Sequence, residues 1–172
     1  MKGVIVHCLE ELVTTRFGGA AWQATLKEAG LKPATMFLVV DDIDDAVVMN
    51  IIAALSRHLK LSIAQLADMF GEYWVTAYSQ KLYARYYATH ANAKAFLLDL
   101  NEIHVTITKT IKQARPPRFT YEWKDERTLL MRYISHRRLL DIAVGLVKGV
   151  AKQYHEELDV KKISADTLQI TF

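Results

Sequence analysis

Apolar residues recur every three or four positions along most of the first 114 residues, which is the period of an amphipathic helix. The first helix is predicted over residues 2–17, ending at Gly18-Gly19, on an apolar stripe formed by Val4, Ile5, Cys8, Leu9, Leu12 and Val13. The same pattern predicts helices over residues 20–29, 47–59, 63–78 and 91–114, with a short helix or turn over 83–87. We expect the acidic run 41–45 and Ser62 to cap the helices that follow them, and Pro116-Pro117 to end the longest helix.

The spacing of apolar residues changes from the helical period to the alternation of strands after Pro116-Pro117. Residues 118–124 and 128–134 are predicted as strands of one hairpin, and residues 158–163 and 167–172 as strands of a second. A helix over residues 139–155 separates the two hairpins. This order predicts an α+β fold, with an N-terminal helical lobe packed against a C-terminal lobe of about four antiparallel strands and helices. We expect residues 1–172 to form a single domain.

Composition narrows the class of protein. Of the 172 residues, 51% are hydrophobic and 24% charged, as in ordinary globular domains, and the net charge of +3 does not favour nucleic-acid binding. The single cysteine, Cys8, excludes a disulfide scaffold and a zinc site with several thiolates. No apolar run reaches the ~20 residues of a membrane span and no signal peptide is evident, so we expect a cytoplasmic protein that does not bind membranes. We do not expect an enzyme, because we find no Ser/His/Asp set, paired carboxylates or Gly-rich phosphate loop.

One histidine lies on the apolar face of the longest predicted helix. His104 shares its stripe with Leu97, Leu100, Ile107 and Ile111, so its imidazole is expected to point into the interior. Two roles are open: a core histidine hydrogen-bonded to a backbone carbonyl, or an axial ligand to a buried metal cofactor. A neutral imidazole in apolar surroundings suits haem iron.

A row of polar side chains, Tyr133-x-Ser135-x-Arg137, stands at the end of a predicted strand. Alternate strand residues share a face, so two hydroxyls and a guanidinium are expected in line over about 13 Å. Such a row suits a pair of carboxylates like the haem propionates, or else it is a solvated face whose arginine pairs with an acidic neighbour. Pro117 follows His104 by thirteen residues and either only ends the helix or also presses on a flat cofactor.

Together these features resemble the H-NOX domain, the haem–nitric oxide/oxygen-binding domain also found at the start of soluble guanylate cyclase. The resemblance covers essentially the whole chain. It is carried by residues 1–5 (MKGVI), 70–74 (FGEYW), 101–109 (NEIHVTITK), 115–118 (RPPR) and the Tyr133-x-Ser135-x-Arg137 motif. It implies one haem b per chain, buried between the helical lobe and the sheet lobe, and a gas-sensing role in signal transduction.

The resemblance also implies roles for individual residues. His104 would be the proximal iron ligand, and Tyr133, Ser135 and Arg137 would hold the propionates. The other residues expected to contact the haem are Pro117, Ile5 and Leu100. Those expected to line the distal pocket, where the gas binds, are Leu9, Trp74, Tyr78, Ile142 and Leu146.

The choice of gas depends on one position. Oxygen-binding members of the family carry a distal tyrosine five residues past the motif arginine, and here that position is Ile142. Bound O₂ is stabilised by a hydrogen-bond donor, which NO and CO need much less. We therefore expect a ferrous haem that binds NO and CO and excludes O₂. An O₂ sensor that uses the Tyr78 hydroxyl, or an interaction module without a cofactor, is the alternative.

A sensor needs a way to pass on its signal. The resemblance implies that NO releases His104 from the iron and that the ensuing shift of the two lobes is read by a partner. Because the sequence ends at Phe172, we expect that partner to be a separate histidine kinase or cyclic-di-nucleotide enzyme. The cysteine-rich zinc site of some relatives is not expected, since no cysteine follows Cys8.

Overall fold

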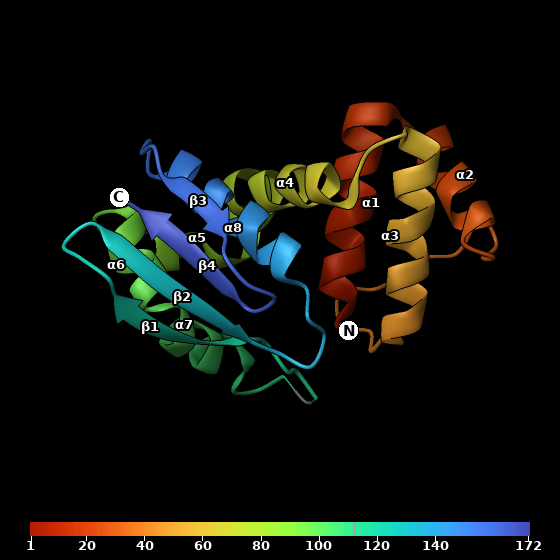
Figure 1. Cartoon of the computed structure of the whole chain (residues 1–172). Coiled ribbons are helices and arrows are strands. Elements are labelled where there is room, and N and C mark those ends of the chain that lie inside the picture. Colours follow the sequence, from red (N-terminus) through yellow and green to blue (C-terminus); the bar gives the residue numbers. More distant parts are fainter. Residues whose placement is uncertain (112) are drawn as a thin grey trace. The chain divides into compact units, whose positions relative to one another are not determined.

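The computed structural model describes residues 1–111 and 113–172, and they divide into two compact units, Met1–Leu66 and Ala67–Phe172 (Figure 1). The helices in chain order are α1 (Gly3–Phe17), α2 (Gly19–Glu28), α3 (Asp45–Leu59), α4 (Ile63–Tyr73), the π-helix η1 (Trp74–Tyr78), α5 (Gln80–Ala88), α6 (Ala93–Leu98), α7 (Leu100–Thr108) and α8 (Leu140–Gln153). The strands are β1 (Arg118–Trp123), β2 (Thr128–Ile134), β3 (Asp159–Lys162) and β4 (Thr167–Thr171). The predicted α+β class and the four antiparallel strands are confirmed.

The first unit is helical, and its helix ends follow the capping residues in the sequence. Gly18, with φ 85°, ends α1, and the Asp44 carboxylate accepts a hydrogen bond from the Ala46 amide at 2.8 Å to start α3. Ser62 and Gln65 form a reciprocal capping box at the start of α4, with bonds of 3.2 and 2.8 Å. The predicted caps are therefore confirmed.

The second unit packs helices on one face of an antiparallel sheet with the strand order β1-β2-β4-β3 (Figure 1). Alternate strand residues are buried, which places one face against the helices and leaves the other to solvent. The main core residues on the strands and on α6 and α8 are Phe119, Leu129, Met131, Leu168, Ile170, Phe96, Leu97, Val147 and Val150. The predicted bounds of β2 agree with the structure residue for residue.

The predicted helix over residues 91–114 is wrong, because the structure interrupts it at Asp99 and ends it at Thr108. The Asp99 amide bonds to carbonyls three and four residues back, which tightens the turn, and its carboxylate lies 3.1 Å from His90 Nε2. At the other end, α7 stops at Thr108, whose hydroxyl donates to the His104 carbonyl at 2.6 Å. Pro116-Pro117 comes eight residues later and therefore does not end the helix. Lys112, inside the predicted range, lies outside the described residues.

The predicted helix over residues 63–78 changes its winding before it ends. Its last five residues form η1, in which the Ser79 amide bonds to the Trp74 carbonyl five residues back at 2.8 Å. Such π-turns insert an extra residue into a helix and often occur at functional sites. The aromatic stretch 83–87 lies within α5, which is kinked at Tyr83.

Among the described residues, no single helix combines the length and the apolar character of a membrane span. The helices α3 and α4–η1 meet that test only as a pair, and a bend of 107° separates them.

Candidate functional site

His104 lies on α7 and is half-buried, with its Nδ1 atom 3.1 Å from the Pro117 carbonyl oxygen. A carbonyl only accepts hydrogen bonds, so Nδ1 carries the proton and Nε2 keeps its lone pair. The expected core histidine bonded to a backbone carbonyl is thus present. The same bond orients a metal-binding imidazole, because metal-ligating histidines use their second nitrogen in this way.

The surroundings of His104 keep its imidazole neutral. Burial lowers the pKa of His104 below its ordinary value, and the positive charge of Arg118 lowers it further, whereas the hydrogen bond to Pro117 opposes them. Neutral imidazole is the form that binds a metal ion. The side chain is therefore ready, in both tautomer and charge, to offer Nε2 as a ligand.

An aromatic ring connects His104 to the polar motif of the next strand. The Phe119 ring centroid lies 6.0 Å from that of His104 and 5.9 Å from that of Tyr133. Phe119 on β1 and Tyr133 on β2 are paired residues of the sheet. Tyr133 is buried, and its hydroxyl has no hydrogen-bond partner among residues 1–111 and 113–172. Sequence reasoning missed Phe119, although its place two residues after Pro117 was a usable signal.

The motif predicted a straight row of side chains along one strand. Ser135 and Arg137 instead lie beyond the end of the strand. β2 ends at Ile134, and residues 135–138 form a turn in which the Arg137 amide donates to Ser135 Oγ at 3.3 Å. Arg138, with φ 52°, reverses the chain. The turn directs the Arg137 guanidinium to the Arg115 carbonyl at 3.0 Å, beside the two prolines. The motif therefore reaches the Pro117 loop through a turn.

The apolar stripe expected around His104 is only partly present. Leu97 is fully buried, and Leu100, at the start of α7, is half-buried against the core of the second unit. Ile111 is 39% exposed because α7 has already ended, so its place on this stripe was wrong.

The residues expected in the distal pocket lie on three helices. The Trp74 and Tyr78 rings of η1 stack with centroids 5.6 Å apart, and Tyr78 is buried. Ile142 and Leu146 lie one turn apart on α8 and are both half-buried. In the first unit, α1 carries Leu9, which is buried, and Ile5, which is half-buried.

Glycines bring the helix of Ile142 and Leu146 close to the helix that leads into η1. A Cβ atom on Gly71 would lie 2.0 Å from the Gly145 carbonyl carbon, and one on Gly145 would lie 2.0 Å from the Ala67 carbonyl oxygen. The backbones of α4 and α8 are thus in direct contact, and this contact sets how α8 presents its apolar residues.

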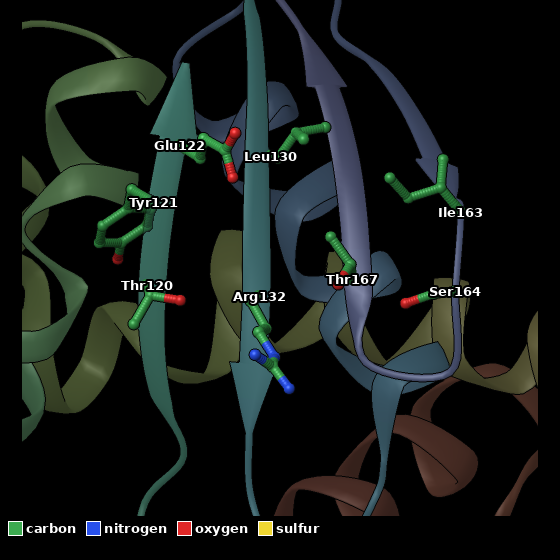
Figure 2. A pocket seen from close by; sticks show the side chains of 8 residues that line it. All are labelled: Thr120, Tyr121, Glu122, Leu130, Arg132, Ile163, Ser164 and Thr167. Atoms are coloured by element: carbon green, nitrogen blue, oxygen red, sulfur yellow. The ribbon is translucent and has the colours of Figure 1, made fainter. Parts of the chain in front are cut away.

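A separate hollow of about 440 Å³ lies on the second unit, mainly over the solvent-facing side of the sheet (Figure 2). Figure 2 shows its lining residues Thr120, Tyr121, Glu122, Leu130, Arg132, Ile163, Ser164 and Thr167. Arg132 Nε donates to the Asp166 carboxylate at 2.8 Å, and this bond, with two from hydroxyls, lowers the pKa of Asp166. None of the residues expected to bind haem lines this hollow.

Comparison with known proteins shows the family to which this chain is similar. The model of the Haem-NO-binding family matches residues 2–162. The soluble guanylate cyclases gcy-34 and gcy-37 of Caenorhabditis elegans are each 28% identical, over 88% and 90% of this chain. The alignments cover 23% and 22% of those relatives, so this chain spans about a quarter of their length.

Solved structures of H-NOX domains share the fold. An oxygen-binding H-NOX domain related to soluble guanylate cyclases, solved as its oxygen complex, is 26% identical with a TM-score of 0.82, over 100% of this chain and 95% of that one. An H-NOX protein from S. oneidensis in the Fe(II)NO ligation state has a TM-score of 0.86 over 99% and 97% of the two chains. At 18% identity, this second likeness is one of fold alone.

Proposed function

Because the chain belongs to the Haem-NO-binding family, we propose that it senses nitric oxide at a haem held by His104. Members of this family are haem-based gas-sensor domains related to soluble guanylate cyclase, and haem is the cofactor of this chain. The observation that carries the assignment of His104 is its Nδ1 bond to the Pro117 carbonyl at 3.1 Å, which leaves Nε2 free to bind a metal.

The donor set of the second unit fits a haem. His104 offers a neutral nitrogen, while Tyr133 offers the hydroxyl of a largely buried side chain and Arg137 a planar cation suited to a carboxylate. The bound haem would supply an iron that takes a diatomic gas as a ligand. In this proposal Tyr133, Ser135 and Arg137 hold the propionates, and Pro117 and Leu100 contact the porphyrin.

Selectivity for NO and CO over O₂ is part of the proposal. Ile142 and Leu146 present only apolar atoms from α8, so neither donates a hydrogen bond to a bound gas. Ile5 and Leu9 are equally apolar and are proposed to complete the distal pocket. An oxygen sensor is the second candidate, because Tyr78 is a buried tyrosine on the π-helix and stacks on Trp74.

We also propose that the signal leaves through α7. When Nε2 is no longer held, the helix that carries His104 is free to shift, and a partner that prefers the shifted state reads the change. By analogy with stand-alone bacterial relatives, the proposed partner is a histidine kinase or a cyclic-di-nucleotide enzyme, acting in the cytoplasm. We propose that residues 1–172 act as one non-catalytic domain, since the family match at residues 2–162 spans both units.

Absorption spectra of the reduced, purified protein test this function. Under argon we expect a haem Soret band, with NO a band typical of five-coordinate nitrosyl haem, and in air no stable oxygen complex. A stable oxygen complex would select the second candidate and point to Tyr78. No Soret band after haem is added would leave only an interaction module without a cofactor.

A further inference from the structure

A series of hydrogen bonds joins His104 and the helical residues before it to Pro117 and the strand β1 that follows. The Tyr121 hydroxyl donates to the Leu97 carbonyl at 2.7 Å. The Asn101 side chain bonds twice to the Phe119 backbone, with Nδ2 donating to the carbonyl at 2.8 Å and Oδ1 accepting from the amide at 2.9 Å. The His104 bond to Pro117 completes the series. We call these contacts the helix–strand ladder, with the rungs Leu97–Tyr121, Asn101–Phe119 and His104–Pro117.

The spacing of the rungs matches the geometry of the two elements. Along the helices the partners advance by four residues, across the break at Asp99, and then by three within α7, which corresponds in helical geometry to about 6 and 4.5 Å. Along the strand segment they go back by two residues per step, which is about 6.6 Å. All three rungs form together at this register, so a shift of the helix along the strand would break them.

The middle rung uses the free edge of the sheet. β1 is the end strand of the order β1-β2-β4-β3, so one side of its backbone lacks a neighbouring strand. The Asn101 amide pairs with both the N–H and the C=O of Phe119, as a residue of a neighbouring strand does. Arg118 adds a further bond from its guanidinium to the Asn101 carbonyl at 3.0 Å. Asn101 is thus the residue that locks α7 to the sheet.

We propose that Asn101 is a positioning residue for His104, fixing α7 at the register in which Nδ1 reaches the Pro117 carbonyl. The inference rests on the proposed function, because it takes His104 as the haem ligand. It adds a route for the signal: α7 cannot move along the sheet without breaking the middle rung, so displacement of His104 acts on β1 through Asn101. Sequence reasoning missed this role, although a polar residue one turn before His104 was a usable signal.

The substitution Asn101→Asp tests the ladder with the smallest change in shape. The carboxylate keeps an acceptor for the Phe119 amide, but it loses the donor and places negative charge beside the Phe119 carbonyl. Asn92→Asp is the matched control, because Asn92 caps α6 with its Oδ1 atom, at 2.8 Å from the Ala95 amide, and aspartate caps equally well. If Asn101→Asp does not fold, the uncharged Asn101→Ser replaces it, since serine does not span both bonds.

Two measurements are made on the full, haem-loaded chain: amide hydrogen exchange at Phe119, and the iron–histidine stretching frequency of the ferrous protein. In Asn101→Asp the repulsion between the carboxylate and the Phe119 carbonyl should open the whole rung, so we expect Phe119 exchange to be about tenfold faster and the frequency to shift. Neither change is expected in Asn92→Asp. Faster exchange with an unchanged frequency would show a purely structural role and overturn the proposal, as would no change in either. A wild-type chain without haem absorbance would instead overturn the proposed function. If the wild type binds haem through His104 but Asn101→Asp changes neither the exchange nor the frequency, only the role of Asn101 is overturned.

Discussion

At the scale of single residues, the position of one proton decides what His104 offers. The helical pattern placed this histidine on an inward stripe, but not the partner of its ring. The partner is a carbonyl thirteen residues later, at Pro117, and it fixes the proton on Nδ1. Spacing identified both residues as candidates, and only their contact assigns the free lone pair to Nε2.

The substitution His104→Gly is expected to abolish haem retention, because it removes the proposed nitrogen ligand. Imidazole added to the solution should restore haem binding by occupying the space that the side chain leaves. The Soret absorbance of the purified protein measures both effects. His155→Gly is the control, because the His155 side chain is exposed and its backbone has a φ of 56°, a conformation that glycine adopts without strain. Full haem content in His104→Gly without imidazole would contradict the assignment.

The substitution Ile142→Tyr is expected to create a stable oxygen complex, because a hydroxyl on this face of α8 would donate to bound O₂. One added hydrogen bond of ~1 to 1.5 kcal/mol corresponds to an O₂ affinity about tenfold higher than in the wild type. Titration of the ferrous protein with O₂, followed by its absorption spectrum, measures that affinity. Ile142→Phe supplies the ring without the hydroxyl and should behave like the wild type. An equal response of the Tyr and Phe variants to O₂ would place residue 142 away from the gas.

At the scale of elements, two helices that position the candidate site are set by backbone contacts. α7 begins after the break at Asp99, whose carboxylate lies 3.1 Å from His90 Nε2, and it ends at Thr108, whose hydroxyl donates to the His104 carbonyl. α8 lies directly on α4 because glycines face each other there. Neither effect follows from helical periodicity, which is why the helix over 91–114 was predicted too long.

The substitution Gly145→Ala is expected to destabilise the protein by about 1 to 3 kcal/mol, the usual cost of overpacking. The added Cβ would lie 2.0 Å from the Ala67 carbonyl oxygen, so the backbones of α4 and α8 would have to move apart. Urea unfolding monitored by circular dichroism gives the free energy. The control is Gly19→Ala on α2, where no atom lies within 4 Å of the added Cβ and stability should be unchanged or slightly raised. Similar stabilities for the two variants would refute the close contact.

At the scale of the whole molecule, the chain has two compact units, and the family match runs through both. The residues of the ladder and the polar motif all lie in the second unit, whereas Ile5 and Leu9 lie in the first. The proposal of one haem-binding domain therefore predicts that the cofactor affects the stability of the chain as a whole.

Removal of haem is expected to lower the melting temperature, because a ligand that binds only the folded state stabilises it by mass action. The effect reaches about 4 kcal/mol when free haem exceeds its dissociation constant a thousandfold. Scanning calorimetry of the haem-loaded and haem-free chains measures the difference. The His104→Gly variant without imidazole should show little response to added haem, and a response equal to that of the wild type would mean that the haem is held elsewhere.

The sequence by itself determined the features that depend on neighbouring residues. Periodicity and capping residues predicted the α+β class, the bounds of β2 and the caps at Asp44 and Ser62, because helices and strands follow local patterns. The histidine, the prolines and the polar motif also identified the candidate site. Tertiary structure alone decided how Arg137 reaches the Arg115 carbonyl and that Asn101 pairs with Phe119. These contacts join residues eighteen or more positions apart, and no local pattern contains that information.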